Sequence, residues 1–379
     1  MSLANFFIVS SYGTFFLLPL FLMRHGGSKA DIGIVMGVFS FSSVLCRPWI
    51  SAMVDRIGRK KSYMLGCLTL TIFPMAYLFF DGELNTFYAP LLLIRIAHGI
   101  GLAIAFTSSF IYIADITPEG RLNEGIAMFG VTGLTGMAVG PVIAEFILQR
   151  LGFSALFLFA SATAGMGFLL QTPLPESYLK RTKSSQSFSQ VLRKKKTLHV
   201  ALLFFLFGIG LAASGSFVSP FAKHLNLSFV SLYFVAYCSA AIMTRLLGSR
   251  IADRVGERRI IPHALFVTGC GMLLMTFLQG NLILFTSGFM SGCGHGFLFP
   301  SLSALALRHE PIELRGKVTA IFTGALDGGV FAGSILLGYV GEWAGFRAIF
   351  VLAAASLFLG FIVQKYAKVN GKGPSPMTF

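Results

Sequence analysis

The sequence predicts an all-α integral membrane protein with twelve transmembrane helices in two pseudo-symmetric six-helix bundles. Apolar residues make up 55% of the 379 residues and charged residues only 12%, whereas soluble domains carry roughly 25% charged residues. Runs of about 20 apolar residues recur along the whole chain, and each is long enough to cross about 30 Å of hydrocarbon as a helix. A charged motif in the first half also returns in the second half. Together these observations exclude a soluble protein and indicate a duplicated membrane protein.

The apolar runs predict helices rather than barrel strands, because they are long and continuous instead of alternating over about ten residues. The first run begins almost at Met1 with no cleavage site before it, so we expect it to be retained as a membrane helix. Ser28 and Asp31 have the spacing of a capping box before the second run. The expected spans are Leu3–Met23, Ile32–Val54, Ser62–Phe80, Tyr88–Ala114, Gly125–Leu148, Phe153–Leu170, Leu198–Phe221, Phe229–Ala252, Ile260–Leu278, Leu282–Leu307, Val318–Val340 and Phe346–Tyr366.

The repeat relates the two halves of the chain. Arg47–Lys61 and Arg245–Arg259 share an arginine, a serine, the string Asp-Arg-x-Gly and a closing basic pair, at an offset of 198 residues. Glycines of later spans recur at an offset of 193, namely Gly99 with Gly292, Gly136 with Gly329 and Gly140 with Gly333. Because six crossings are an even number, the halves should be related by an axis along the membrane normal. We expect one bundle over 1–170, a basic cytoplasmic loop over 171–199 and a second bundle over 200–379.

The net charge of +15 raises the question of a nucleic-acid partner, and the positions of the charges argue against one. With the N-terminus in the cytoplasm, the outer loops hold only Arg24, Lys29, Arg150, Lys223 and Arg347. This asymmetry follows the positive-inside rule and predicts that both termini are cytoplasmic. The basic run at 193–196 is expected to be a solvated linker near anionic lipid headgroups, with a specific lipid or protein site as the alternative.

No pattern of catalytic or metal-binding residues stands out. The five cysteines all fall inside apolar runs without close pairs, so we expect no disulfide framework, no metal site and no cofactor. The strings G-x-S-x-G and H-E-x-x-H and a phosphate-binding glycine loop are missing from the sequence, so no catalytic residue is predicted. An enzyme or a membrane sensor therefore remains only a remote alternative.

The loop after the second span carries a family resemblance. Ser51-x-x-x-Asp55-Arg56-x-Gly58-Arg59-Lys60-Lys61 resembles the pattern G-x-x-x-D-R-x-G-R-[KR]-x of major facilitator superfamily transporters, with Ser in place of the first Gly in both copies. The resemblance covers nearly the whole chain, including the two six-helix halves and the basic central loop. A single D-R-x-G string would be a weak signal. Two copies in register at the same span-to-loop boundary are a strong one.

The resemblance implies a gate made by these loops. Asp55 would accept hydrogen bonds from the N-terminus of the eleventh span, where the helix dipole is positive, and Arg59 would pair with Asp115. These contacts would clamp the two halves together on the cytoplasmic side. The predicted gating residues are Asp55, Arg56, Gly58, Arg59, Asp115, Asp253 and Arg254; for Arg56 and the following lysines the alternative is simple determination of topology. Arg308 occupies the place of Asp115 in the second half, so we expect that half to lack the relay.

The fifth span contains a second pattern of this kind. Gly136-x-x-x-Gly140-Pro141 resembles the signature of proton antiporters that export drugs, although its closing Gly-Gly is Ala144-Glu145 here. Small residues on one helix face also permit close packing with a neighbouring helix, which is the alternative reading of these glycines.

Charged residues inside the spans are candidates for proton coupling, since each costs about 2.5–3.5 kcal/mol on insertion scales. Asp327 is the acid nearest the middle of the membrane, where the neutral form of a carboxyl group is favoured; a buried arginine partner or a contact to a substrate cation is the alternative. Arg95 resembles the arginine of a family signature linked to proton transfer. The alternative is a packing role in which its head group turns outward. Glu145 is a further candidate for proton coupling. The alternative is an acid at the membrane interface or an external gate. Arg47 and Arg245 are expected to share a structural or gating task.

The sequence therefore predicts a secondary active transporter that works by alternating access, and not an enzyme. The favoured mode is proton-coupled efflux by antiport of a small apolar or amphipathic compound, with proton-coupled uptake by symport as the alternative. The expected partners are a small-molecule substrate, protons and the lipid bilayer, without nucleic acid. The expected setting is a monomer that spans the bacterial inner membrane several times.

Overall fold

The computed structural model describes the backbone of residues 1–118, 122–177, 188–308 and 310–369. Side chains at 48, 51, 122–124, 127, 248–254, 312, 313, 368 and 369 lie outside this description. Within the described residues the elements are helices only: α1 Ser2–Thr14, α2 Leu18–Arg24, α3 Lys29–Ile57, α4 Arg59–Ala76, α5 Leu84–Ile116, α6 Leu122–Gln171, α7 Phe188–Leu192, α8 Lys195–His224, α9 Leu232–Val255, α10 Glu257–Leu274, α11 Asn281–Leu307, α12 Ile312–Val369 and the 3-10 turns Phe15–Leu17, Tyr77–Phe79 and Met275–Phe277.

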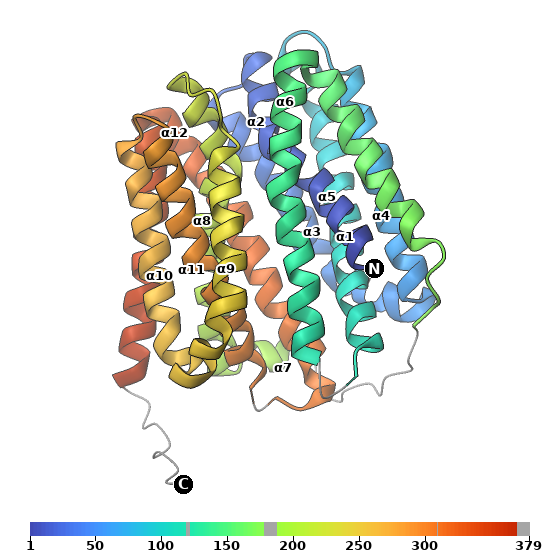
Figure 1. Ribbon diagram of the computed structural model, residues 1–379, viewed down its shortest axis with the longest axis vertical. Coiled ribbons are helices and arrows are strands. Elements are labelled where there is room, and N and C mark those ends of the chain that lie inside the picture. Colours follow the sequence, from blue (N-terminus) through green and yellow to red (C-terminus); the bar gives the residue numbers. More distant parts are fainter. Residues whose placement is uncertain (119–121, 178–187, 309, 370–379) are drawn as a thin grey trace.

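The helices account for the twelve predicted crossings. Nine of the described helical segments are long and apolar enough to span a membrane. Two of these, α6 and α12, reverse direction at Gly152 and Gly345, whose φ angles of 82° and 81° belong to the left-handed region, and Figure 1 shows α6 turning back at its upper end. Counting each as two crossings gives eleven, and α9 with its shorter apolar stretch Leu232–Leu247 is the twelfth. The all-α membrane fold is confirmed.

Two local signals in the sequence set helix boundaries. Ser28 caps α3 in a complete capping box with Asp31, as predicted. Gly58 ends α3 with a φ of 102°, and its counterpart Gly256 ends α9 with a φ of 83°. Only glycine adopts this region without strain, which explains why a single glycine joins two antiparallel helices in each copy of the motif.

The helices form two packed sets that meet along two seams. In Figure 1 the helices up to α6 lie on the right and those from α8 on lie on the left, with α6 beside α9 between them. The other seam joins α3 to α12, and there a Cβ atom placed on Gly338 would lie 3.1 Å from the Cα of Gly33. Small residues therefore permit the close approach of the two sets.

The glycines of the antiporter-like signature have a packing task. A Cβ atom on Gly136 or Gly140 would collide with the α1 backbone at Phe6 and Ser10, and the counterparts Gly329 and Gly333 face the α8 backbone in the same way. The duplication thus preserves a close contact between the first and fifth spans of each half. This geometry agrees with the packing alternative for Gly136 and Gly140.

The molecule has a linker end and an opposite end. The linker end holds the α3–α4 turn at Gly58, the segments flanking 178–187, and α7, and it lies at the bottom of Figure 1. The opposite end holds the α2–α3 turn and the reversals at Gly152 and Gly345.

Candidate functional site

An ion pair joins the two helix sets near the middle of the α3–α12 seam. Arg47 of α3 forms a salt bridge with Asp327 of α12 and donates a second hydrogen bond from Nη1 to Thr323 Oγ1 at 2.9 Å. The Ser43 hydroxyl donates to the same carboxylate at 2.8 Å. The two charged side chains are 21% and 23% exposed, so neither is fully buried. Asp327 therefore has the arginine partner that the sequence left open as an alternative.

Arg95 lies deeper and has a different environment. Its side chain is 2% exposed, its Nε donates to the Val35 carbonyl at 3.2 Å, and its guanidinium lies 4.3 Å from the centre of the Phe39 ring. No acidic partner for it is found among the described residues. The head group is thus held against aromatic rings instead of turning outward to the membrane surface, which corrects the alternative reading of this residue.

An aromatic side chain links the two charged centres. Tyr12 of α1 stacks on Phe39 with ring centres 5.9 Å apart, and its hydroxyl is close enough to feel the charges of both Asp327 and Arg95. His98 packs edge-on against Phe15 and Phe39 at 4.6 and 5.4 Å. Tyr12 and Arg95 therefore share the Phe39 ring, and the charge of Asp327 also acts on Tyr12.

The predicted relay is present at the linker end. Arg59 Nε donates to Asp115 Oδ2 at 3.0 Å, with side-chain exposures of 1% and 0%. Arg59 also reaches Asp55 at 3.2 Å, but 62% of the Asp55 side chain is exposed. Within the described part of the chain, the Asp55 carboxylate contacts Arg59 and no group of α12. Asp55, Arg59 and Asp115 thus lie together, and no contact between Asp55 and the start of the eleventh span is found among the described residues. Arg56 and Ile57 are also exposed.

Glu176 completes this end and was not anticipated. Its Oε1 accepts hydrogen bonds from the backbone N–H groups of Arg59 at 2.7 Å and Lys60 at 3.2 Å. A carboxylate at a helix N-terminus is stabilising, because it satisfies free donors and meets the positive end of the dipole. The start of the central linker is therefore fastened to α4. The sequence offered no signal for this beyond a lone acid after Pro175.

The second half carries the relay pair with its charges reversed. Arg308 forms a salt bridge with Glu257, and these residues occupy the positions of Asp115 and Arg59. Arg308 does not repeat the role of Asp115, as expected, but an attraction is kept because both members of the pair changed sign together. The side chains of Asp253 and Arg254, two further predicted gating residues, lie outside the described residues.

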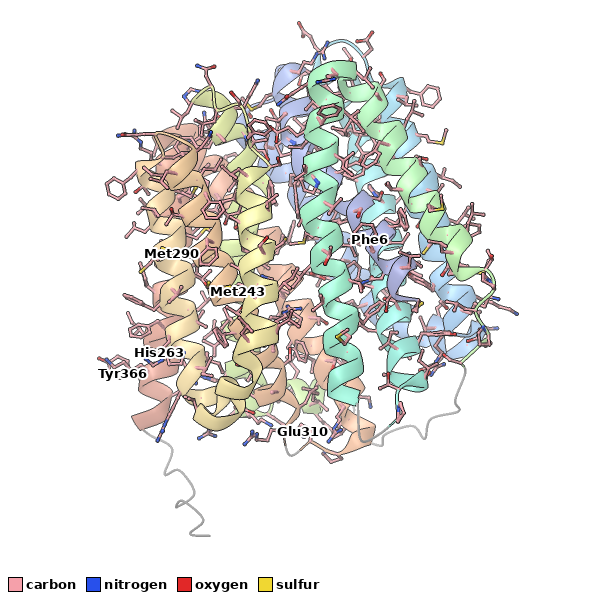
Figure 2. The ribbon with its side chains drawn as sticks, viewed as in Figure 1. Phe6, Met243, His263, Met290, Glu310 and Tyr366 are labelled. Carbon is pink, nitrogen blue, oxygen red and sulfur yellow. The ribbon has the colours of Figure 1, made fainter. Side chains whose placement is uncertain are left out.

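The basic run of the linker binds an acid rather than only facing solvent. Lys194 Nζ lies 3.0 Å from Glu310 and Lys196 Nζ 3.6 Å from it. Figure 2 shows Glu310 at the lower, linker end of the molecule. The loop between α11 and α12 therefore holds the end of the linker next to α8.

The opposite end is held by carboxylates that cap helices of the other set. Glu145 of α6 is 5% exposed and accepts hydrogen bonds from the backbone N–H groups of Val230 and Ser231, both at 2.8 Å, at the start of α9. Glu342 of α12 accepts one at 3.0 Å from Lys29 at the start of α3. The fifth span of each half thus caps the second span of the other half. Glu145 lies at a seam, which agrees with the external-gate alternative, and Glu342 was missed.

Comparison with known proteins points to one family. A family model described as Major Facilitator Superfamily matches residues 1–281 and 200–375. The chain is 24% identical over 341 residues to the uncharacterised MFS-type transporter YhhS of Escherichia coli K12, covering 89% of this chain and 84% of the relative. It is 22% identical to the multidrug resistance protein MdtG of Dickeya zeae, covering 94% and 89%. Among solved structures it resembles the human organic anion transporter MFSD10 with a TM-score of 0.71, 18% identity and coverage of 96% and 98%. It also resembles the nucleoside transporter NupG with a TM-score of 0.76, 14% identity and coverage of 98% of both chains.

Proposed function

This chain belongs to the major facilitator superfamily and is a multi-pass membrane transporter, and from that premise we propose that it exports a small amphipathic compound in exchange for protons. The mechanism is alternating access, in which a bundle over 1–170 and a bundle over 200–379 rock about a central site. The observation that carries this proposal is the ion pair of Arg47 and Asp327 across the seam, because it links a titratable group to the contact between the bundles.

The contacts at the two ends describe one stage of that cycle. At the opposite end Glu145 and Glu342 each cap a helix of the other bundle. At the linker end 62% of the Asp55 side chain is exposed, and among the described residues this side chain contacts Arg59 and no group of α12. We assign this conformation to the state that faces the linker side, with the opposite end latched. In the alternate state Asp55 would cap the start of α12 while the caps of Glu145 and Glu342 release.

Proton coupling follows from the chemistry of the central pair. A proton bound to Asp327 removes its charge, which ends the salt bridge and leaves Arg47 to hydrogen bonds with neutral groups. The seam between α3 and α12 then loses an electrostatic contact, so protonation favours rearrangement of the bundles. Arg95 lies within reach of the same tyrosine and holds a fixed positive charge near the pathway. A proton that enters from the opposite side therefore changes the stability of the latched state.

Export is favoured over uptake by two features. Several relatives, including MdtG, are named multidrug resistance proteins, and the fifth span carries Gly136, Gly140 and Pro141 in the antiporter-like arrangement. Uptake by symport is the second candidate, since one structural neighbour is named a nucleoside transporter. Proteoliposomes with an imposed pH gradient separate the two modes. Substrate and protons should move in opposite directions, and movement of both in the same direction would establish symport instead.

We also propose that the linker end is cytoplasmic, that the protein is a monomer, and that it lies in the inner membrane of a bacterium. The basic residues gathered at the linker end support this orientation. A membrane-impermeant thiol reagent should label E83C in intact cells and label K195C only after permeabilisation. The reverse pattern would invert the orientation.

Glu145→Gln is expected to weaken the opposite-end latch without unfolding the protein. The amide oxygen still accepts a hydrogen bond, but the negative charge at the start of α9 is lost, and such a charge stabilises a partly buried helix terminus by up to about 2 kcal/mol. The population ratio of the two states should shift by about 5- to 30-fold. Labelling of S228C from outside in intact cells measures this shift.

The matched control is Glu83→Gln, an exposed acid at the same end that forms no side-chain cap on its helix. Its labelling at S228C should equal that of the parent protein. Equal labelling of the Glu145 and Glu83 variants would contradict the latch.

A further inference from the structure

Arg245 is an incompletely partnered buried cation in the middle of α9. Its Nε is buried without a hydrogen-bond partner, and no ion pair or hydrogen bond to its guanidinium is found among the described residues. Its Nη1 lies at the backbone of α6, where it would be 3.0 Å from a Cβ atom placed on Gly130. Arg245 thus crosses the α6–α9 seam just as Arg47 crosses the α3–α12 seam.

The internal repeat shows what Arg245 lacks. Arg47 is held by Thr323 and Asp327, and Ser43 donates a hydrogen bond to the same Asp327 carboxylate. At the offsets of the repeat, the corresponding residues around Arg245 are Gly130, Leu134 and Ala241. All three polar residues of the Arg47 cluster, its two partners and Ser43, therefore correspond to small or apolar residues around Arg245, while the arginine itself has been kept.

The neighbours of Arg245 do not take the place of these partners. Its charge acts on Tyr237, Cys238 and His295, but the Tyr237 hydroxyl and His295 Nδ1 already bond to each other. An arginine without a partner in a membrane interior is costly, and it is retained in proteins mainly where an anion or a cavity meets it.

The charge balance of the interior points the same way. Along the middle of the described spans the charged side chains are Arg47, Arg95, Arg245 and Asp327. Three cations face one carboxylate, so a bound anion would reduce the excess. Arg47 is already neutralised by Asp327, and Arg95 is enclosed by aromatic rings. Arg245 has a buried Nε and, among the described residues, no acid beside it.

We propose that Arg245, whose guanidinium lies against the α6 backbone at Gly130, forms the subsite for an anionic group of the substrate, a carboxylate or a sulfonate. The guanidinium offers a planar fork of donors that matches such a group in two hydrogen bonds. This inference rests on the proposed transport function and narrows its substrate class to amphipathic organic anions. Export of such an anion is also aided by an inside-negative potential, by about 2.3 kcal/mol per charge for each 100 mV.

The test uses three probes that differ only in charge: 2-naphthoate, its neutral amide 2-naphthamide, and 2-naphthylmethylammonium. Binding to the purified full chain is measured by ligand-dependent shifts in Tm. The parent protein should bind naphthoate more tightly than the other two. Arg245→Gln should remove this preference with a loss of about 10- to 100-fold in naphthoate affinity, and Arg245→Lys should restore part of it. Arg150→Gln, an arginine at the opposite end, should leave it unchanged.

A second variant supplies the missing partner from within the protein. Leu134→Asp places a carboxylate at the position of Asp327 in the other half, and it should abolish the preference for naphthoate by occupying Arg245. Without any ligand, Arg245→Met should raise Tm, because it removes a buried cation that has no partner. This measurement needs none of the probes, and it does not require that Leu134→Asp folds.

Three results would each overturn the subsite. The first is equal affinity of the parent protein for naphthoate and naphthamide, including the case in which neither binds. The others are an unchanged preference for naphthoate in Arg245→Gln and a lower Tm in Arg245→Met. The proposed antiport fails separately. If proteoliposomes show no opposed proton movement while the naphthoate preference depends on Arg245, the direction of coupling is wrong and the subsite stands.

Discussion

Exchanging the charges of Arg59 and Asp115 should restore the stability that either single substitution removes. Both side chains are almost fully buried and joined at 3.0 Å. Removal of one partner from a buried pair leaves an uncompensated charge and costs about 3–5 kcal/mol. Arg59→Glu and Asp115→Arg should each lower Tm and the yield of monodisperse protein in detergent, whereas the double variant should recover most of both.

The second half of the chain is the reason to expect this recovery. Glu257 and Arg308 form the same contact with the opposite signs, so this helix junction has already accepted the reversed pair once. The reverse exchange, Glu257→Arg with Arg308→Asp, is the comparison. Its single variants should lower Tm less, because the Arg308 side chain is 56% exposed and exposed ion pairs contribute little to stability. Recovery should be incomplete, because a glutamate at 59 would lie close to Asp55 and Glu176.

The outcome that contradicts a pairwise role is a double variant as unstable as the worse single variant. In that case the arginine at 59 would act through its other contacts, the Val54 carbonyl and Asp55. Near-parental stability of both single variants would show that the pair contributes little to folding. A double-mutant cycle on Tm in one detergent measures the interaction directly.

Asp327→Asn should abolish proton-driven transport while leaving substrate exchange intact. The amide keeps the shape of the carboxylate and can still accept a hydrogen bond from Arg47 or Ser43, but it cannot take up a proton. Transport driven by a pH gradient in proteoliposomes should fall at least tenfold, whereas counterflow of labelled against unlabelled substrate should remain near that of the parent. This split identifies a coupling residue, because a merely structural role would lower both rates together.

Asp81→Asn is the control for this experiment. Asp81 lies in an exposed turn and accepts a hydrogen bond from the adjacent Gly82, so both rates should be unchanged. Full coupling in Asp327→Asn would move the proton-binding step to another acid, and Glu145 would then be the next residue to test.

The twelve crossings were predictable because they depend on local properties. A run of about 20 apolar residues must form a helix in a bilayer, since the backbone has no other way to satisfy its hydrogen bonds there. The capping box of Ser28 and the turn at Gly58 also depend on local sequence. The capping box was predicted and is present, and Gly58 of the repeated motif lies at the turn between two helices. The repeat further indicated which helices correspond in the two halves.

The partners of the charged residues were less predictable. The resemblance paired Arg59 with Asp115, but the caps by Glu176, Glu145 and Glu342 join residues from distant spans or from the linker. Arg308 is an example. Its positive charge at the position of Asp115 suggested that the second half had lost the ion pair, but Glu257 lies opposite Arg308 and pairs with it. A pairwise contact depends on two positions at once, and neither position is informative without the other.

Composition, run length and internal repetition suffice to establish the class of protein, the number of crossings and the duplicated architecture, because burial in lipid constrains each helix separately. Packing settled which helix faces meet. It therefore decided why Arg47 lies against Asp327 while Arg245 lies against Gly130. A helix in lipid is apolar on nearly all sides, so hydrophobic periodicity no longer marks an inward face. Close-packed glycines and a few buried charges decide the arrangement instead.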